Sequence, residues 1–211
     1  MKQLLLDIQP AGLPTLDNFV VGRNAEALHS LRLAASGNKD ARFIYLWGSN
    51  GSGKSHLLQA CTELARQHKV PLVTAENVQL LSDDQQIALF NTYNQLRADT
   101  SAHGGVLLAS GDAAPTQMRL RDDLATRLAW GLVYQLHPLT DAEKSQALRT
   151  HAKERGMKLP EEVVDYCLRH LRRDLPTLIA TLDALDEWSL TEKKPVTVPM
   201  LRKLLQFPIS A

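Results

Sequence analysis

The sequence from residue 48 to residue 55 reads Gly48-Ser49-Asn50-Gly51-Ser52-Gly53-Lys54-Ser55 and fits the spacing G-x-x-x-x-G-K-[ST]. It follows an apolar run, 43 to 47, and precedes a helix-like run, 56 to 68. A strand, a glycine-rich turn and a helix in this order form a phosphate-binding loop, whose backbone N–H groups point at a triphosphate. The stretch therefore predicts a nucleotide site. A chance glycine loop is the alternative, and the flanking runs argue against it.

The loop chemistry assigns roles to individual residues. Lys54 neutralises the outer phosphates, and the Ser55 hydroxyl ligates Mg²⁺. A hydrolytic site also needs a strand that ends in two acids, one for the metal and one to polarise water. The run from 73 to 77 offers Glu76 for Mg²⁺ but then the neutral Asn77, which cannot take a proton from water as a carboxylate can. We expect weak or no intrinsic ATPase activity, unless Glu76 and Asn77 are merely a polar strand end.

Composition limits the class of protein. The 211 residues, 44% of them hydrophobic, suffice for one large core and a smaller second one. The formal net charge of +1 gives no overall field toward nucleic acid or a membrane. Cys61 and Cys167 lack metal-ligand spacing and are expected to be reduced core thiols. Asp7 and Pro10 interrupt the apolar N-terminus before a signal or membrane span could form, so we expect a cytoplasmic protein.

The pattern along the chain predicts three regions. Residues 1–14 contain Pro10, Gly12 and Pro14 and are expected to be a flexible tail. Residues 15–137 alternate strand-like and helix-like runs, which predicts an α/β domain with a parallel sheet covered by helices. Residues 138–211 show only helical periodicity, which predicts a small all-helical domain. Asn24 is expected to cap the first helix, and Thr140 with Glu143 forms a capping box at the first helix of the last region.

Two later segments, 107–115 and 124–131, carry no chemistry from spacing alone. Together with the phosphate loop they resemble the AAA+ ATPase module, and more narrowly the branch that contains the replication initiator DnaA. The resemblance extends from Leu16 to about Leu205. It implies a P-loop AAA+ domain followed by a helical lid, and a bound ADP or ATP with Mg²⁺ as a further ligand.

The resemblance also implies roles for single residues. The segment 16–22 is similar to the part of that branch that lines the adenine pocket. Asp112 matches the sensor 1 position and Arg173 the sensor 2 arginine of the lid, although Asp112 can equally be a turn residue and Arg173 a solvated charge. Arg127 matches the arginine finger, which acts on the phosphates of a neighbouring subunit, the alternative being a surface arginine at a helix end. The nucleotide-binding set predicted is Val21, Gly22, Gly48, Ser49, Asn50, Gly51, Ser52, Gly53, Lys54, Ser55, His56, Asp112 and Arg173.

The sequence departs from the family pattern in two places. The interval from Lys54 to Glu76 leaves no room for the edge strand and helix that the family usually inserts there. No basic helix-turn-helix follows the lid before Ala211, so the chain is expected not to act as an initiator by itself.

The stretch from 3 to 8 fits Q-L-x-L-x-hydrophobic and resembles the bacterial peptide that binds the sliding clamp. In an extended chain Leu4, Leu6 and Ile8 would enter an apolar groove, while the Gln3 amide makes a polar contact. The resemblance implies a regulator that binds the β sliding clamp of DNA polymerase III and reaches DNA only through it. It would promote ATP hydrolysis by DnaA and so switch initiation off, with a homodimer as one arrangement.

The sequence is also compatible with other functions. One is an autonomous AAA+ ATPase of the helicase-loader or clamp-loader type, against which Asn77 argues. Another is a nucleotide-binding adaptor that links partners to the clamp without stimulating hydrolysis. A small-molecule kinase is the remaining enzyme class, but we find no acceptor-binding signature.

Overall fold

The computed structural model describes residues 13–99, 104–172 and 174–206. Within them the chain divides into two compact units, Leu13–Pro138 and the residues from Leu139 onward. The predicted tail residues Gln3, Leu4, Leu6 and Ile8, and the predicted lid residue Arg173, lie outside the described residues. No helix in the described part of the chain is long and apolar enough to cross a membrane.

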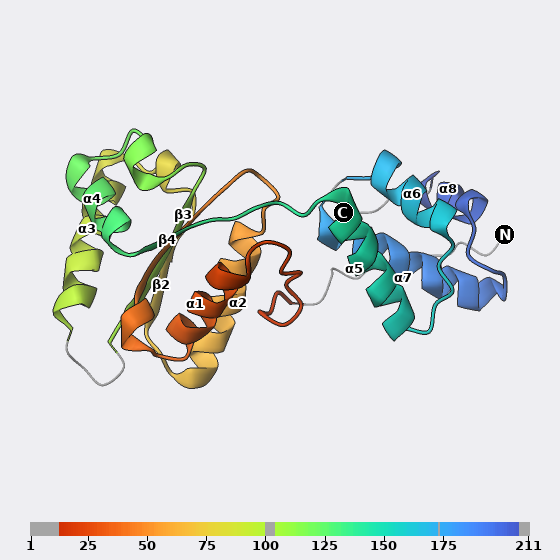
Figure 1. The fold of residues 1–211 in the computed structure, drawn as a ribbon, viewed down its shortest axis with the longest axis horizontal. Helices are drawn as coiled ribbons and strands as arrows, with labels where there is room; N and C mark the ends of the chain where they lie inside the picture. The colour runs from red at the N-terminus through yellow and green to blue at the C-terminus, as the bar shows by residue number, and fades with distance from the viewer. Residues whose placement is uncertain (1–12, 100–103, 173, 207–211) are drawn as a thin grey trace. The chain divides into compact units, whose positions relative to one another are not determined.

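The first unit is built on a parallel sheet with strand order β2-β3-β1-β4 (Figure 1). Its strands are β1 (Phe43–Trp47), β2 (Leu72–Ala75), β3 (Val106–Gly111) and β4 (Leu132–Gln135). Every residue of β3 is buried, as expected for a strand with neighbours on both sides and helices on both faces. The predicted parallel sheet is confirmed, but β4 was missed because its four residues, three half-buried and one exposed, show no alternation of buried and exposed positions.

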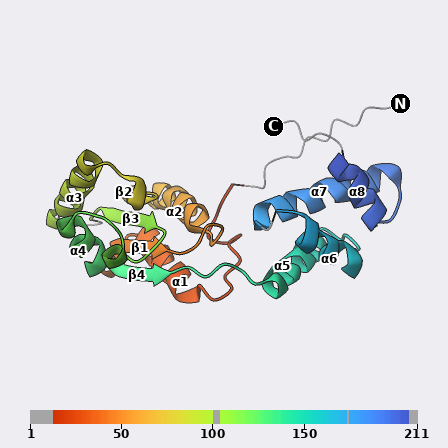
Figure 2. The same ribbon diagram turned by 90° about the horizontal axis from the view of Figure 1, so that it is seen from above.

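Helices cover both faces of this sheet (Figure 1, Figure 2). On one face Ile44 and Leu46 pack with helices α1 (Ala25–Ala35) and α2 (Lys54–His68). On the other face Tyr45 packs with α3 (Asp83–Ala98) and α4 (Asp122–Trp130). Alternation along β1 therefore sends neighbouring side chains into two separate cores. Short 3₁₀ turns complete the unit: η1 (Lys39–Ala41), η2 (Val78–Leu80) and η3 (Pro115–Gln117).

The start of α1 differs from the sequence-based expectation. Asn24 directly precedes the helix, but its side chain makes no capping hydrogen bond. Its Nδ2 donates to the His137 carbonyl oxygen (2.9 Å), and its Oδ1 accepts from the His137 backbone N–H (2.8 Å). The capping prediction was wrong because a partner 113 residues away takes both polar groups of this buried amide. Asn24 thereby ties α1 to the chain that leaves β4.

The second unit contains four described helices: α5 (Asp141–Glu154), α6 (Glu161–His170), α7 (Leu175–Glu192) and α8 (Val198–Gln206). The predicted capping box is confirmed, since Glu143 N donates to Thr140 Oγ1 (3.2 Å) and Thr140 N donates to Glu143 Oε2 (2.7 Å). The unit has its own apolar core, which includes Leu148, Leu178 and Leu182. The all-helical prediction for this part of the chain is thus confirmed.

The two cysteines are free and lie in different cores, Cys61 in the α1–α2 side of the first unit and Cys167 in the helical unit. Burial raises the pKa of the Cys61 thiol to about 12 and that of Cys167 to about 11. A thiol that is buried and stays protonated is a poor nucleophile. The prediction of reduced core thiols is confirmed.

Candidate nucleotide-binding site

The loop between β1 and α2 takes a conformation that two of its glycines make possible. Gly53 has φ +96°, and a Cβ there would lie 2.7 Å from the ring of Phe19. A Cβ on Gly48 would lie 2.4 Å from the Leu136 carbonyl oxygen. A side chain at either position would thus meet a strained backbone or a close neighbour. The loop backbone therefore packs closely against neighbouring residues and leads directly into α2. The N-terminus of a helix favours a bound anion.

Lys54 begins α2 and is 8% exposed. Its Nζ donates to the Gly48 carbonyl oxygen (2.6 Å) and to the Ser49 carbonyl oxygen (3.2 Å), and it lies 4.0 Å from Asp112 Oδ1. A buried ammonium group is unfavourable unless polar partners surround it, and here the loop itself supplies them. The buried Oγ of Ser52 has no hydrogen-bond partner among the described residues. A cation and an unsatisfied hydroxyl in one loop fit a phosphate group.

Ser55 and Glu76 meet although 21 residues separate them. Ser55 Oγ, in the first turn of α2, donates to Glu76 Oε2 (2.6 Å), which directly follows β2. Both side chains are exposed. A hydroxyl and a carboxylate oxygen are the hard ligands that Mg²⁺ prefers, with phosphate and water completing its shell. The pair fits a magnesium ion, whereas Asn77, with φ +52°, opens the turn η2 and offers no carboxylate.

Asp112 follows β3 and joins this cluster through a residue that the sequence did not indicate. Its Oδ2 accepts a hydrogen bond from Gln79 Nε2 (2.9 Å). Burial, and then the nearby Asp112 charge, raises the pKa of Tyr45, whose hydroxyl donates to the Ala113 carbonyl oxygen (3.1 Å). Asp112, Glu76 and the loop thus gather at the carboxyl ends of parallel strands, where such sheets bind ligands. No spacing rule singles out Gln79.

The segment ahead of α1 lies against the start of α2. His56 Nε2 is 3.0 Å from the Thr15 carbonyl oxygen, and the rings of Phe19 and His56 are 5.6 Å apart. Val21 packs on the same core as α2 and accepts a hydrogen bond from Asn24 N (2.9 Å), while Gly22 is exposed with φ +48°. The predicted residues Val21, Gly22 and His56 are therefore in one region. Phe19, which covers Gly53, belongs to the segment 16–22 that the resemblance placed at the adenine pocket, but it was not among the single residues predicted to bind nucleotide.

Arg127 lies apart from this cluster, on α4 and hence on the other face of the sheet from α2. Its guanidinium carbon is 4.6 Å from the ring centroid of Trp130, 5.8 Å from that of Phe90 and 6.0 Å from that of Tyr93. Among the described residues no carboxylate forms an ion pair with Arg127. The predicted finger is a cation held by aromatic rings.

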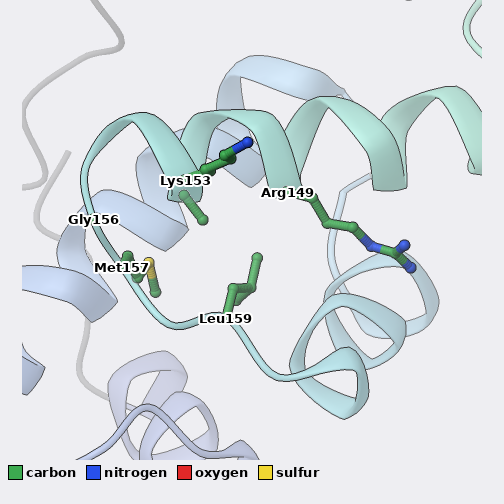
Figure 3. Close-up of a pocket in the computed structure, with 6 residues that line it drawn as sticks. Arg149, Lys153, Gly156, Met157 and Leu159 are labelled. Atoms are coloured by element: carbon green, nitrogen blue, oxygen red, sulfur yellow. The ribbon is translucent and has the colours of Figure 1, made fainter.

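A pocket of about 290 Å³ lies within the helical unit (Figure 3). Arg149 and Lys153 of α5 line it together with Met157 and Leu159, and Arg149 also pairs with Glu161. Ala152 and Gly156 complete the lining. None of the described residues predicted to bind nucleotide lines this pocket.

Two family models match parts of the sequence. Residues 13–78 match the bacterial DnaA ATPase domain, and residues 141–205 match the lid domain of Hda. The first match contains the phosphate loop, Glu76 and the segment with Phe19, and the second contains α5 to α8. The matches therefore fall on the two structural units in the order expected for an AAA+ module and its lid.

Solved structures with the same fold include DnaA from two bacteria. Domain III of the Thermotoga maritima replication initiation protein DnaA aligns with a TM-score of 0.69 at 21% identity, covering 96% of this chain and 100% of that one. DnaA from Aquifex aeolicus bound to AMPPCP aligns with a TM-score of 0.67 at 21% identity, covering 86% of this chain and 70% of that one. A DnaA bound to AMPPCP and single-stranded DNA gives 0.67 at 23% identity, covering 85% and 67%.

The sheet, the phosphate loop and these matches show that the chain has the DnaA-like AAA+ fold. The C-terminal match shows that residues 141–205 are similar to the lid domain of Hda.

Proposed function

We propose that this protein is a regulatory inactivator of DnaA of the Hda type, which stimulates hydrolysis of the ATP bound to DnaA and so limits replication initiation. One observation carries the proposal: Arg127 is an arginine without a carboxylate partner among the described residues, and it lies on the opposite face of the sheet from the helix that opens the phosphate loop. Because the Arg127 guanidinium is not neutralised by a described carboxylate and lies away from the protein's own phosphate loop, it is suited to act on a nucleotide bound to another molecule.

The protein's own nucleotide, ADP or ATP, would be held by residues 48–55. Lys54 would turn from the loop carbonyls to the phosphates, and Ser55 with Glu76 would hold Mg²⁺. The DnaA structures with bound AMPPCP support nucleotide binding by this fold. Because Asn77 replaces the second acid, the bound nucleotide would serve structure more than turnover. Asp112 and Arg173 would sense its phosphates.

Arg127 would act in trans on DnaA. A guanidinium that meets the transferring phosphoryl group stabilises the charge that develops there, and such a finger is worth about 10³ to 10⁵ in rate. The clamp-binding residues Gln3, Leu4, Leu6 and Ile8 would keep the protein on DNA-loaded clamp, which raises its local concentration near DnaA without a direct DNA contact. A homodimer would instead present Arg127 to a second copy of this chain.

The test measures phosphate release from ATP-loaded DnaA with and without this protein, in the presence of DNA-loaded clamp. We expect stimulation that Arg127→Ala abolishes while nucleotide affinity stays unchanged. Arg119→Ala is the control, because Arg119 is an exposed arginine that lies just ahead of α4. Loss of nucleotide binding in Arg127→Ala would contradict the action in trans.

The tail is tested in the same assay. The double variant Gln3→Ala, Leu4→Ala should lose stimulation at limiting protein concentration and regain it when the concentration is raised. Rapid phosphate release by this protein alone would instead support an autonomous ATPase. No stimulation together with slow turnover would leave a nucleotide-binding adaptor.

A further inference from the structure

Three aromatic side chains surround the guanidinium of Arg127, and we call Phe90, Tyr93 and Trp130 the aromatic cluster. Phe90 and Tyr93 come from α3, whereas Trp130 ends α4, the helix of Arg127 itself. Tyr93 is 4% exposed and belongs to the core, but Trp130 is 60% exposed and is the ring nearest to Arg127. A large aromatic ring this exposed gains little from burial, so its contact with Arg127 calls for an explanation.

We propose that Trp130, with the rest of the aromatic cluster, is the positioning residue of the arginine finger: it holds the Arg127 guanidinium in place for a neighbour's phosphates without neutralising it. This inference rests on the proposed function and deepens it. It concerns how the finger is prepared, whereas the proposed function concerns what the finger acts on.

The chemistry of the contact supports this role. A carboxylate partner would hold an arginine firmly, but it would also occupy the N–H donors and cancel the charge that a phosphate must meet. An aromatic face attracts the cation through its quadrupole and leaves the five N–H donors at the rim of the guanidinium plane free. Among the described residues Arg127 has aromatic partners and no carboxylate partner. The charge is therefore held and still available.

Holding the side chain matters because an unsupported arginine samples many rotamers. A finger that must be ordered at each encounter reaches its reactive position less often, and a misplacement of about 1 Å can lower a rate by about 100-fold. Phe90 and Tyr93 of α3 contact the Arg127 guanidinium from one helix, and Trp130 provides the ring closest to it. Removal of Trp130 should thus free the guanidinium while Phe90 and Tyr93 keep the helices packed.

Arg97 provides a matched control on the same ring. Its guanidinium carbon lies 5.3 Å from the centroid of Trp130, so it too stacks on this side chain, but it comes from the last turn of α3. Arg97→Ala removes a cation from Trp130 and leaves Arg127 with its aromatic partners. It should change neither the position nor the effect of the finger.

The first experiment uses the isolated protein and needs no partner. Protons above an aromatic face are shifted upfield, so the Nε–H signal of Arg127 in a proton–nitrogen NMR spectrum should lie upfield of its ordinary position. Trp130→Leu should return it toward that position, and Trp130→Phe should retain part of the shift. An Arg127 signal that is unshifted in the wild-type protein, or that Trp130→Leu leaves unchanged, would overturn the inference.

The second experiment measures phosphate release from ATP-loaded DnaA on DNA-loaded clamp as a function of the concentration of this protein. We expect Trp130→Leu to lower the maximal stimulated rate by about tenfold, within the roughly 100-fold range that small misplacement produces, and to leave the half-maximal concentration unchanged. Trp130→Phe should recover most of the rate, and Arg97→Ala should match the wild type. Thermal unfolding of each variant checks that α3 and α4 stay packed.

The outcomes separate this inference from the proposed function. A rise in the half-maximal concentration at unchanged maximal rate would make Trp130 a docking residue and overturn its positioning role, while stimulation by the wild type would still support the proposed function. Absence of stimulation by the wild type, with the NMR shift present, would overturn the proposed function and with it any role in preparing a finger.

Discussion

Lys54 shows how a single residue of the loop combines two demands. It must be charged to bind phosphate, yet it is almost fully buried. The carbonyl oxygens of Gly48 and Ser49 meet its ammonium group, so the charge is tolerated without a tight carboxylate partner. These carbonyl contacts are weak competitors for a phosphate, which carries full negative charge. The Lys54 side chain thus already lies at the loop where it would bind phosphate.

Lys54→Met should weaken nucleotide binding strongly. A hydrogen bond to a charged group contributes about 1.5 to 3 kcal/mol, which corresponds to roughly a tenfold to hundredfold loss of affinity. Titration with a fluorescent ADP analogue measures this loss. Lys39→Met is the control, because Lys39 is also a lysine of the first unit but is exposed in η1. Equal affinities for Lys54→Met and the wild type would remove the phosphate loop from the proposed site.

At the scale of elements, a distant partner can override a local helix-capping signal. Thr140 and Glu143 form the capping box that their spacing predicts, with hydrogen bonds between the two residues in both directions. Asp174 likewise caps α7 by accepting a hydrogen bond from Thr177 N (2.9 Å). Asn24 is the exception, because it is buried and His137 supplies both a donor and an acceptor. The same signal therefore gives different structures in different surroundings.

The cap at Asp174 makes the helical unit sensitive to acid. Partial burial raises the pKa of Asp174, but hydrogen bonds from Thr177 outweigh it and hold the pKa below its usual value. The cap therefore stabilises fully above the unfolded-state pKa of about 3.9, and this stability is lost as pH falls through the lower folded-state pKa.

Asp174→Ala should lower the free energy of unfolding of the helical unit by about 1 kcal/mol at pH 7. The difference from the wild type should shrink below about pH 4, as the wild-type carboxylate is protonated. Urea unfolding at a series of pH values measures both effects, with Asp165→Ala, an exposed position on α6, as the control. A difference that stays constant down to pH 2 would contradict this account.

At the scale of the whole molecule, each hydrophobic core is made of residues from only one of the two units. Leu46 lies in the core between the sheet and α1–α2, and Leu182 lies in the core of the helical unit. Both are fully buried. Since each unit encloses its own apolar core, each has its own source of stability. The phosphate loop, Glu76, Asp112 and Arg127 all lie in the first unit.

Leu182→Ala and Leu46→Ala should each destabilise one unit by about 2 to 5 kcal/mol, because both leave a cavity in a packed core. Hydrogen exchange followed by mass spectrometry resolves the response of each unit. We expect faster exchange in α5 to α8 for Leu182→Ala and in β1 to β4 for Leu46→Ala. Equally faster exchange throughout the chain in both variants would mean that the two units unfold as one.

The sequence by itself determined the phosphate loop, the alternation of strands and helices, and the change to an all-helical unit after residue 138, because short-range spacing and periodicity encode these features. It could not reveal β4, whose four residues, none of them fully buried, become a strand only by pairing with β1. Nor could it reveal the contact of Gln79 with Asp112, or of Phe90 and Tyr93 with Arg127. Those pairs lie more than 30 residues apart in the chain, and only the packing of α3, α4 and the strand ends brings their side chains within reach.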